Sequence, residues 1–345
     1  MKKVRIGIAG LGRLGMAHAR NIAYYTAGAE LTALCRRDPD ALQAAGGELG
    51  VKDLFTDFDE MLQRADIDGV AIVTASDNHA RQAVQALRAG KHVFCEKPLG
   101  ISAEECWQVE QAALARPDLV FFPGFMRRFD PSYQYAREKI DAGLIGEPYL
   151  FKGFAADPMS TIEECIQYGG KGSGGLFMDL GIHDMDLARW FLGENPTGVF
   201  AQGGSFRYPV FAQRGDAEAG IASYTFASGK MAVLHAGRAA PHGYHVETEI
   251  VGTKGSIRIG PTPRKNHAVL YLQQGVVTEC YENFHQRFEE AYRLELQAFV
   301  DCIRRGKQPD VTVTDGRKAV QVAQATTRSF REKRYLEISY ASFLR

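Results

Sequence analysis

Short apolar runs alternate with amphipathic stretches over the first 123 residues of this 345-residue chain. The run Val70–Ala75 is continuous, which is typical of a strand buried on both faces of a sheet. Strands that are separated by helices indicate parallel pairing. The pattern predicts strands over Val4–Ala9, Leu31–Cys35, Val70–Ala75, Val93–Cys95 and Leu119–Phe122.

Helical spacing fills the intervals between these strands. Pro39 suits the first turn of a helix, and Gly90 suits the residue that follows the last turn. Ser102 and Glu105 have the S-x-x-E spacing of a capping box. We therefore expect helices over Leu14–Tyr25, from Pro39, over Asn78–Ala89 and from Ser102 to about Arg116.

The pattern of apolar and polar residues changes near Gly124, and after that point it is mainly typical of β-strands. Turns with Gly229 and with Gly252 to Gly255 predict two antiparallel hairpins. A glycine- and serine-rich loop is expected over residues 169–175. The expected strands are Tyr149–Phe154, Ile221–Phe226, Met231–Ala236, His245–Val251 and Ser256–Ile259, and the expected helices are Ser132–Ala142, Leu176–Leu192, Phe284–Arg305 and Asp315–Arg331.

The predicted fold class is α/β, with two domains. Residues 1–123 should form a doubly wound parallel sheet. Residues 124–345 should form an α+β domain with a large, open and mainly antiparallel sheet, and the last helix is allowed to pack back on the first domain. Antiparallel sheets often cover one face only, so we expect the other face to pair between subunits of a homo-oligomer.

Composition narrows the class of protein. The formal net charge is zero, without the basic surplus of a nucleic-acid binder, so we expect no nucleic-acid partner. No apolar run approaches the ~18 residues of a membrane span, and the start of the chain does not resemble a signal peptide. The six cysteines contain no C-x-x-C pair and are expected to be reduced and buried. We expect a cytoplasmic protein.

A glycine turn follows the first predicted strand and opens the first helix. Its residues are Gly10, Leu11, Gly12, Arg13, Leu14 and Gly15, in the G-x-G-x-x-G pattern. The glycines permit a tight turn, close approach of a pyrophosphate and close helix packing, and the helix N-terminus attracts the phosphates. This is the fingerprint of a Rossmann dinucleotide site with NAD or NADP. The same turn without a ligand is the alternative.

The second strand ends on Arg36, where an NAD site usually has an acidic residue that binds the adenosine ribose. An arginine there accepts a 2′-phosphate, which favours NADP. It can equally stack on adenine or face solvent while NAD is used. The sequence leaves both cofactors open. We also expect Thr74, Ala75, His79 and Glu96 to contact the dinucleotide.

Two further segments contain candidate catalytic residues. Lys97 follows a strand end, where substrate and nicotinamide meet in such sheets; a lysine there can hydrogen-bond the reacting hydroxyl. Asp179 and His183 are four residues apart on one predicted helix, and a histidine can take the hydroxyl proton while Asp179 orients it. A metal at this pair is an alternative, but no third ligand is evident nearby, and we expect none. An ordinary solvated lysine or helix-surface pair is the other reading.

Together these segments resemble the glucose–fructose oxidoreductase/inositol dehydrogenase/rhizopine-catabolism (Gfo/Idh/MocA) family over essentially the whole chain. The glycine turn, E-K-P and G-G-x-x-x-D-x-G-x-H-x-x-D occur in the family's order. The resemblance implies that Lys97, Asp179 and His183 are catalytic. It also implies a cis peptide between Lys97 and Pro98.

The segment from Gly124 to Pro131 resembles the inositol dehydrogenase branch. That likeness makes Arg127, Asp157 and His242 candidate substrate ligands; a salt bridge for Arg127 and a plain loop histidine for His242 are the alternatives. Two features depart from the pattern: Arg36 is not acidic, and the common His-Arg-Asn after the second domain's first strand is absent. The substrate is therefore not fixed as myo-inositol.

The resemblance implies reversible oxidation of one secondary hydroxyl of a cyclic polyol, by hydride transfer to NAD or NADP with His183 as base. Myo- or scyllo-inositol is the expected substrate. The alternatives are a dehydrogenase for an aldose or unusual hexose, a redox-assisted glycosidase, and a non-catalytic cofactor-binding regulator. The family resemblance also implies a dimer or a homotetramer.

Overall fold

The computed structural model describes residues 2–64, 66–169 and 172–340. These residues divide into two compact units, and each is described by itself. Unit 1 contains the chain up to Phe129 together with Glu290–Val320, and unit 2 contains Asp130–Glu289 and Gln321–Tyr340. Gly170 and Lys171 of the expected glycine-rich loop lie outside the described residues.

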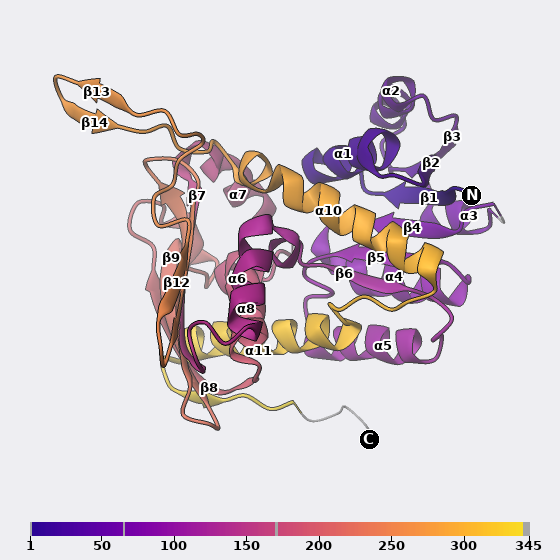
Figure 1. The fold of residues 1–345 in the computed structure, drawn as a ribbon. Coiled ribbons are helices and arrows are strands. Elements are labelled where there is room, and N and C mark those ends of the chain that lie inside the picture. The colour runs from indigo at the N-terminus through magenta and orange to yellow at the C-terminus, as the bar shows by residue number, and fades with distance from the viewer. Residues whose placement is uncertain (1, 65, 170–171, 341–345) are drawn as a thin grey trace. The chain divides into compact units, whose positions relative to one another are not determined.

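Unit 1 is built on a parallel sheet, as the apolar runs predicted, and the sheet has six strands (Figure 1). The order β3-β2-β1-β4-β5-β6 reverses direction between β1 and β4, which is the doubly wound arrangement. β3 is only three residues long and has no counterpart among the predicted ranges. The strands are β1 Val4–Ala9, β2 Ala29–Cys35, β3 Asp53–Phe55, β4 Gly69–Ile72, β5 His92–Glu96 and β6 Phe121–Gly124.

The helices of this unit begin at the expected caps. Asp38 accepts a hydrogen bond from the Ala41 amide ahead of Pro39, and Ser102 and Glu105 form the predicted capping box. The expected helix over Leu14–Tyr25 changes to a π-turn in its second half. The helices are α1 Arg13–Arg20, η1 Asn21–Tyr25, α2 Pro39–Leu49, α3 Phe58–Leu62, α4 Ser76–Arg88, α5 Ala103–Leu114 and η2 Met126–Phe129.

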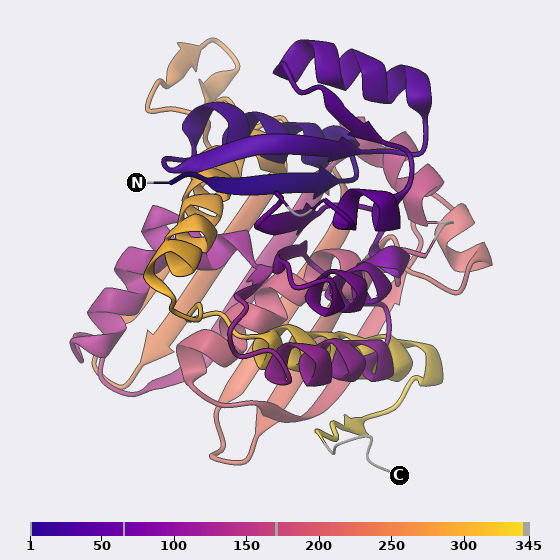
Figure 2. The same cartoon turned by 90° about the vertical axis from the view of Figure 1, so that its right-hand side faces the viewer.

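Unit 2 is built on a mixed, mostly antiparallel sheet of seven strands (Figure 2). Both predicted hairpins are present, as β9–β10 and β11–β12, but β7 and β10 pair in parallel, which the sequence pattern did not show. The strands are β7 Pro148–Pro158, β8 Pro196–Gly204, β9 Ala219–Phe226, β10 Met231–Ala240, β11 His245–Gly252, β12 Ser256–Ile259 and β15 Leu336–Glu337, with a separate hairpin of β13 Leu270–Leu272 and β14 Gly275–Val277.

One face of this sheet is covered and the other is not. Alternate residues of β11 are buried. The hydroxyl groups of Thr248 and of Tyr133 in the helix Pro131–Asp141 share a hydrogen bond of 2.9 Å, and both side chains are fully buried. The opposite face leaves Ile221, Met231 and Val233 exposed. The helices and turns of this unit are α6 Pro131–Asp141, η3 Met159–Thr161, α7 Ile162–Gly169, η4 Phe177–Gly181, α8 Ile182–Leu192 and α9 Val210–Gln213.

Two long helices divide between the units. α10 (Phe284–Arg305) begins in unit 2 and continues into unit 1, and α11 (Val313–Glu332) begins in unit 1 and continues into unit 2. Within unit 1, Arg317 of α11 donates to the Glu110 carboxylate of α5 at 2.6 Å, and both side chains are nearly buried. Among the helices of the described ranges, none is long and apolar enough to cross a membrane.

The buried Glu110–Arg317 pair gives the first prediction. Glu110→Ala should lower the free energy of unfolding by about 3 kcal/mol, because it leaves a desolvated guanidinium without its carboxylate. Thermal unfolding followed by circular dichroism measures the effect. Glu104→Ala, at an exposed position of the same helix, is the matched control and should leave the midpoint unchanged. Equal midpoints for the two variants would contradict a stabilising role for the pair.

Candidate active site

The glycine turn has a backbone that only glycine can form at two of its three positions. Gly10 has φ of +92°, and a Cβ there would meet the Val73 carbonyl oxygen at 2.4 Å. A Cβ on Gly15 would lie 1.8 Å from the Gly10 oxygen. A Cβ on Gly12 would instead meet nothing within 4 Å. Gly12 therefore borders open space where a pyrophosphate can approach, which fits a dinucleotide.

Helix α1 presents its N-terminus at this turn. Gly12 is the residue before the first turn and makes no side-chain cap, and no acidic residue occupies the first turn. The first turn of α1 therefore offers the amides of Arg13, Leu14 and Gly15. No carboxylate from this turn neutralises the partial positive charge at the helix N-terminus. This arrangement suits a bound anion.

Arg36 at the end of β2 is held by its own chain. Its Nη1 donates to the Leu11 carbonyl oxygen of the glycine turn at 2.6 Å, and its Nη2 lies 3.9 Å from Asp38. The guanidinium thus stabilises the glycine turn by a hydrogen bond. The side chain is about one third exposed, at 35%, so part of it still faces solvent.

The segment after β4 is tied to the E-K-P segment by one histidine. The ring nitrogens of His79, which is buried, lie 2.7 Å from the Pro98 carbonyl oxygen and 3.0 Å from that of Thr74. Burial lowers the pKa of His79 below its usual range. Thr74 also donates to Gln82 at 2.6 Å, and Ala75 is the residue before α4. His79 therefore links the two loops expected to line the cofactor.

Strand β5 ends on Glu96, and Lys97 follows it. The Lys97 amide donates to the Glu96 carboxylate at 3.0 Å, and the Lys97–Pro98 peptide is cis, which confirms the expectation from the family resemblance. Glu96 is also 2.7 Å from His18 Nε2 of α1. The glycine turn, Arg36, Thr74, Ala75, His79 and Glu96 all belong to the C-terminal edge of the parallel strands of unit 1, where such sheets bind ligands.

In unit 2, Asp179 lies in the π-turn η4 directly before α8. The sequence spacing assumed a regular helix, but Asp179 lies in a π-turn, and such turns are frequent at functional sites. Asp179 accepts a charge-assisted hydrogen bond from Arg238 at 3.2 Å. Asp216 lies 3.8 Å from the same guanidinium.

Arg238 is a site residue that the sequence analysis missed. It is 1% exposed on β10, and its positive charge is balanced by Asp179, Asp216 and Asp157, which together raise the pKa of the guanidinium against the lowering effect of burial. One signal could have found it. Every second residue of β10 faces the protein interior, namely Ala232, Leu234, Ala236 and then Arg238. A charged residue on the buried face of a strand is exceptional.

The other candidates in unit 2 divide into two sets. Asp157 on β7 shares the electrostatic neighbourhood of Arg238 and Asp179. His183 is 7% exposed in the first turn of α8. His242 is exposed and pairs at 3.2 Å with His245, whose ring packs on Phe154. Asp157 and Asp179 therefore both act on Arg238, whereas His242 has a different partner.

Arg127 lies in unit 1, in the turn η2, and is 3% exposed. Its neighbour Arg128 faces Asp315 at 3.6 Å. Among the described residues, one set of metal-ligating types gathers closely: His18, Glu96 and Glu295 of unit 1. None of the residues expected to be catalytic belongs to this set. Lys97 is connected to the set because its amide donates to Glu96.

These features define a nicotinamide-dinucleotide oxidoreductase of two parts. Residues 4–124 match the oxidoreductase family with an NAD-binding Rossmann fold, and residues 137–338 match that family's C-terminal alpha/beta domain. The chain therefore belongs to the Gfo/Idh/MocA oxidoreductase family, as its motifs predicted.

The most similar relatives include inositol dehydrogenases. The chain is 39% identical to scyllo-inositol 2-dehydrogenase (NAD(+)) of Bacillus subtilis, covering 95% of this chain and 94% of that protein. It is 42% identical to a scyllo-inositol dehydrogenase from Lactobacillus casei solved with NAD(H) and scyllo-inositol, with a TM-score of 0.94 over 97% and 99% of the chains. A myo-inositol 2-dehydrogenase from Lactobacillus plantarum is 38% identical, with a TM-score of 0.95 over 98% and 100%.

The glycine turn gives the second prediction. Gly12→Ala should fold normally, because its Cβ meets nothing, but should weaken NADH binding by about 10-fold or more as the methyl group occupies the approach of the pyrophosphate. Gly15→Ala should instead lower the thermal midpoint, because its Cβ collides with the Gly10 oxygen. NADH fluorescence titration and thermal unfolding separate the two effects. A Gly12→Ala protein with unchanged NADH affinity would contradict a pyrophosphate at this turn.

Proposed function

We propose that this protein oxidises one secondary hydroxyl of scyllo-inositol with NAD⁺, yielding the ketone, NADH and a proton. The observation that carries the proposal is the whole-chain likeness, at 42% identity and a TM-score of 0.94, to an enzyme solved with both NAD(H) and scyllo-inositol. This chain retains Lys97, Asp179 and His183 at the positions of the family motif. The absent His-Arg-Asn segment also favours an inositol other than myo-inositol.

We propose that segment 1–123 serves as the dinucleotide-binding domain and segment 124–345 as the substrate domain. Bound NAD⁺ supplies the hydride acceptor. His183 accepts the hydroxyl proton, and Lys97 hydrogen-bonds the reacting oxygen. Asp179, held by Arg238, receives a hydroxyl group or orients the base. Asp157 and Arg127 are proposed to bind further hydroxyls. His242 is the weakest of the substrate candidates, because it hydrogen-bonds to His245.

We propose NAD as the working cofactor and NADP as a poorer one. Two relatives support this choice: one carries NAD(+) in its name and the other was solved with NAD(H). The geometry of Arg36 supports it as well, because its guanidinium is engaged with the Leu11 oxygen and Asp38 rather than projecting as an unoccupied cation. The remaining exposed part of Arg36 can still contact a 2′-phosphate, so we expect weak use of NADP.

We further propose a cytoplasmic homo-oligomer, with a tetramer as the expected form. Ile221, Met231 and Val233 form an exposed apolar set on the uncovered face of the unit 2 sheet, and a second subunit can bury it. The six cysteines are free thiols, which suits a reducing compartment.

The proposed reaction is tested by initial rates on scyllo-inositol, myo-inositol, glucose and their stereoisomers, with NAD and NADP separately. We expect the highest kcat/KM for scyllo-inositol with NAD, and a fall of about 100-fold or more for Lys97→Ala. A higher kcat/KM for glucose would favour the sugar dehydrogenase alternative. Near-normal turnover by Lys97→Ala on every accepted polyol would overturn the assignment of Lys97.

The role of Arg238 is tested by Arg238→Met and Arg238→Lys. Loss of the cation leaves Asp179 and Asp216 without their counter-charge, so Arg238→Met should lower kcat/KM for the polyol by about 100-fold through misplacement of Asp179. NADH affinity should not change, and Arg238→Lys should restore part of the activity. Arg258→Met, at an exposed arginine of the same sheet, is the control. Loss of NADH binding along with activity would indicate a general structural role instead.

A further inference from the structure

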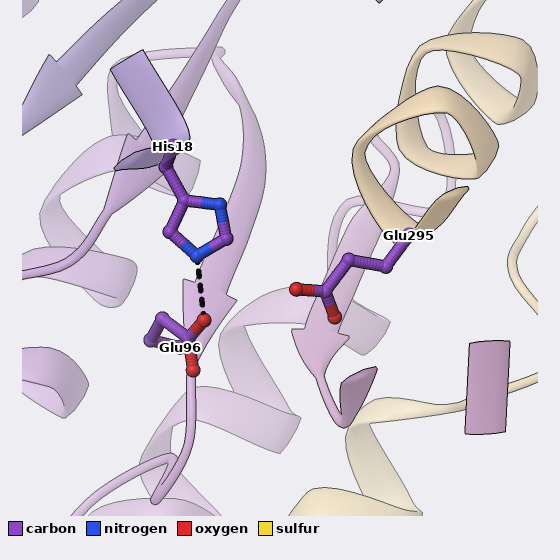
Figure 3. Close-up of side chains that lie close together, drawn as sticks. All are labelled: His18, Glu96 and Glu295. Atoms are coloured by element: carbon purple, nitrogen blue, oxygen red, sulfur yellow. Dashed lines mark hydrogen bonds and ion pairs between the residues drawn. The ribbon is translucent and has the colours of Figure 1, made fainter. Parts of the chain in front are cut away.

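A buried cluster of three ionisable side chains lies within unit 1, from three separate elements (Figure 3). His18 comes from α1, Glu96 from the end of β5 and Glu295 from α10. Their exposed fractions are 0%, 3% and 0%. One nitrogen or oxygen atom from each lies within 4.8 Å of the others, and the Glu295 carboxyl points toward the other two.

Glu295 is the unusual member of the cluster. Neither carboxyl oxygen has a hydrogen-bond partner among the residues that the structure describes. Burial away from water, and then the charge of Glu96, raise the pKa of the Glu295 carboxyl well above its usual range. A carboxyl group in such surroundings keeps its proton at neutral pH, and its O–H then needs an acceptor.

His18 contacts two aromatic rings and one carboxylate. Its ring lies edge-on to Phe94 and to Tyr292, with centroids 5.3 and 5.4 Å away. Its Nδ1 is buried and has no hydrogen-bond partner within the described ranges, so a hydrogen there would be an orphaned donor. The hydrogen therefore belongs on Nε2, which donates to Glu96 at 2.7 Å.

Glu96 is the acceptor available to Glu295. Its carboxylate accepts from His18 Nε2 and from the Lys97 amide, and two carboxylate oxygens offer about four lone-pair positions in all. Within the described ranges, the charge of Glu96 acts on the Glu295 carboxyl. Among the described residues the Glu295 carboxyl makes no hydrogen bond, and one atom of it lies within 4.8 Å of the Glu96 carboxylate, so the Glu295 side chain has to turn to bring an O–H to Glu96.

We propose that Glu295 is a protonated carboxylic acid that donates a hydrogen bond to Glu96, and that Glu295 and His18 are positioning residues for the Glu96-Lys97 segment. The pair shares one negative charge and one proton in a site closed to water. Glu96 is thereby fixed from the side of α1 and from the side of α10. This inference rests on the proposed function in one respect, the contact of Glu96 with the cofactor.

A divalent cation could also neutralise two carboxylates, but the geometry favours the proton. Two ligands of one tetrahedral zinc ion stand about 3.3 Å apart, given zinc–ligand distances of about 2.0–2.1 Å. His18 Nε2 and Glu96 Oε1 are closer, at 2.7 Å, which is the distance of a direct hydrogen bond. The rings of Phe94 and Tyr292 lie edge-on to His18 on two sides.

The proposal has a pH consequence with a definite sign. A carboxyl whose pKa is higher in the folded than in the unfolded protein makes the folded state bind more protons. Stability is then full below the unfolded pKa and falls as pH rises toward the raised pKa of Glu295. Glutamine in place of Glu295 keeps the shape and the donor but cannot ionise, so it should remove this part of the pH dependence.

The experiment compares the full-length wild-type protein with Glu295→Gln and Glu295→Leu, and with Glu290→Gln as the control at an exposed position of the same helix. Thermal midpoints are measured from about pH 5 to pH 9, the range over which such a carboxyl can ionise. Relative to the wild type, Glu295→Gln should gain about 3 °C or more between the two ends of the range. Glu290→Gln should follow the wild type.

NADH affinity supplies the second readout. Glu295→Leu removes the donor to Glu96 and should weaken NADH binding about 10-fold, whereas Glu295→Gln should restore most of that loss. A buried residue with a merely structural role would give the opposite order, because leucine suits an apolar site better than glutamine does. Equal NADH affinity in both variants would overturn the positioning role.

The outcomes separate this inference from the proposed function. A wild-type protein that binds no NADH would contradict the proposed function, while the pH series would still test the proton on Glu295. A Glu295→Gln protein whose midpoint keeps the wild-type pH dependence would overturn the proton. Stoichiometric zinc or manganese in the purified wild type, lost in Glu295→Gln and on chelation, would show a metal site and overturn the proposal as well.

Discussion

The close approach of helix α1 to the first strand is the constraint on which unit 1 depends. Gly10 and Gly15 lie so near each other that a single methyl group would not fit between the turn and the helix. This approach opens the N-terminus of α1 toward a phosphate, and it also brings His18, one turn further along, against the end of β5. The proposed pyrophosphate site and the His18–Glu96 hydrogen bond are therefore consequences of one packing contact.

In unit 2 a buried cation has the corresponding role. Arg238 projects from an otherwise small and apolar strand face, and three aspartates from β7, η4 and the segment before β9 supply its counter-charge. A charge so far from water requires such partners, which fixes the direction of Asp179 more firmly than a helix surface could. The π-turn at Asp179 is compatible with this demand, because it departs from regular helix geometry at the residue that Arg238 holds.

Local signals in the sequence predicted what is decided locally. Apolar runs, the Pro39 cap, the capping box at Ser102 and the glycine turn all depend on residues close together in the chain, and each is present in the structure. The parallel pairing of β7 with β10, the partners of Arg238 and the encounter of Glu295 with Glu96 depend on residues tens to hundreds of positions apart. Three-residue β3 is stabilised by its neighbour β2 rather than by its own pattern. The family motifs named the candidate catalytic residues, but not the side chains that hold them.

The division of α10 and α11 between the units has a consequence for the nascent chain. When a ribosome has made the first 129 residues, all six strands of the parallel sheet exist, yet residues 290–320 of the same unit do not. Phe94 and Phe122 then lack Phe299, Glu110 lacks Arg317, and Glu96 lacks Glu295. Since synthesis proceeds at about 5–20 residues per second, residues 290–320 of unit 1 are made on the order of ten seconds or more after its first 129 residues. During this interval the apolar rings of Phe94 and Phe122 lack the helix residue that contacts them in the finished protein.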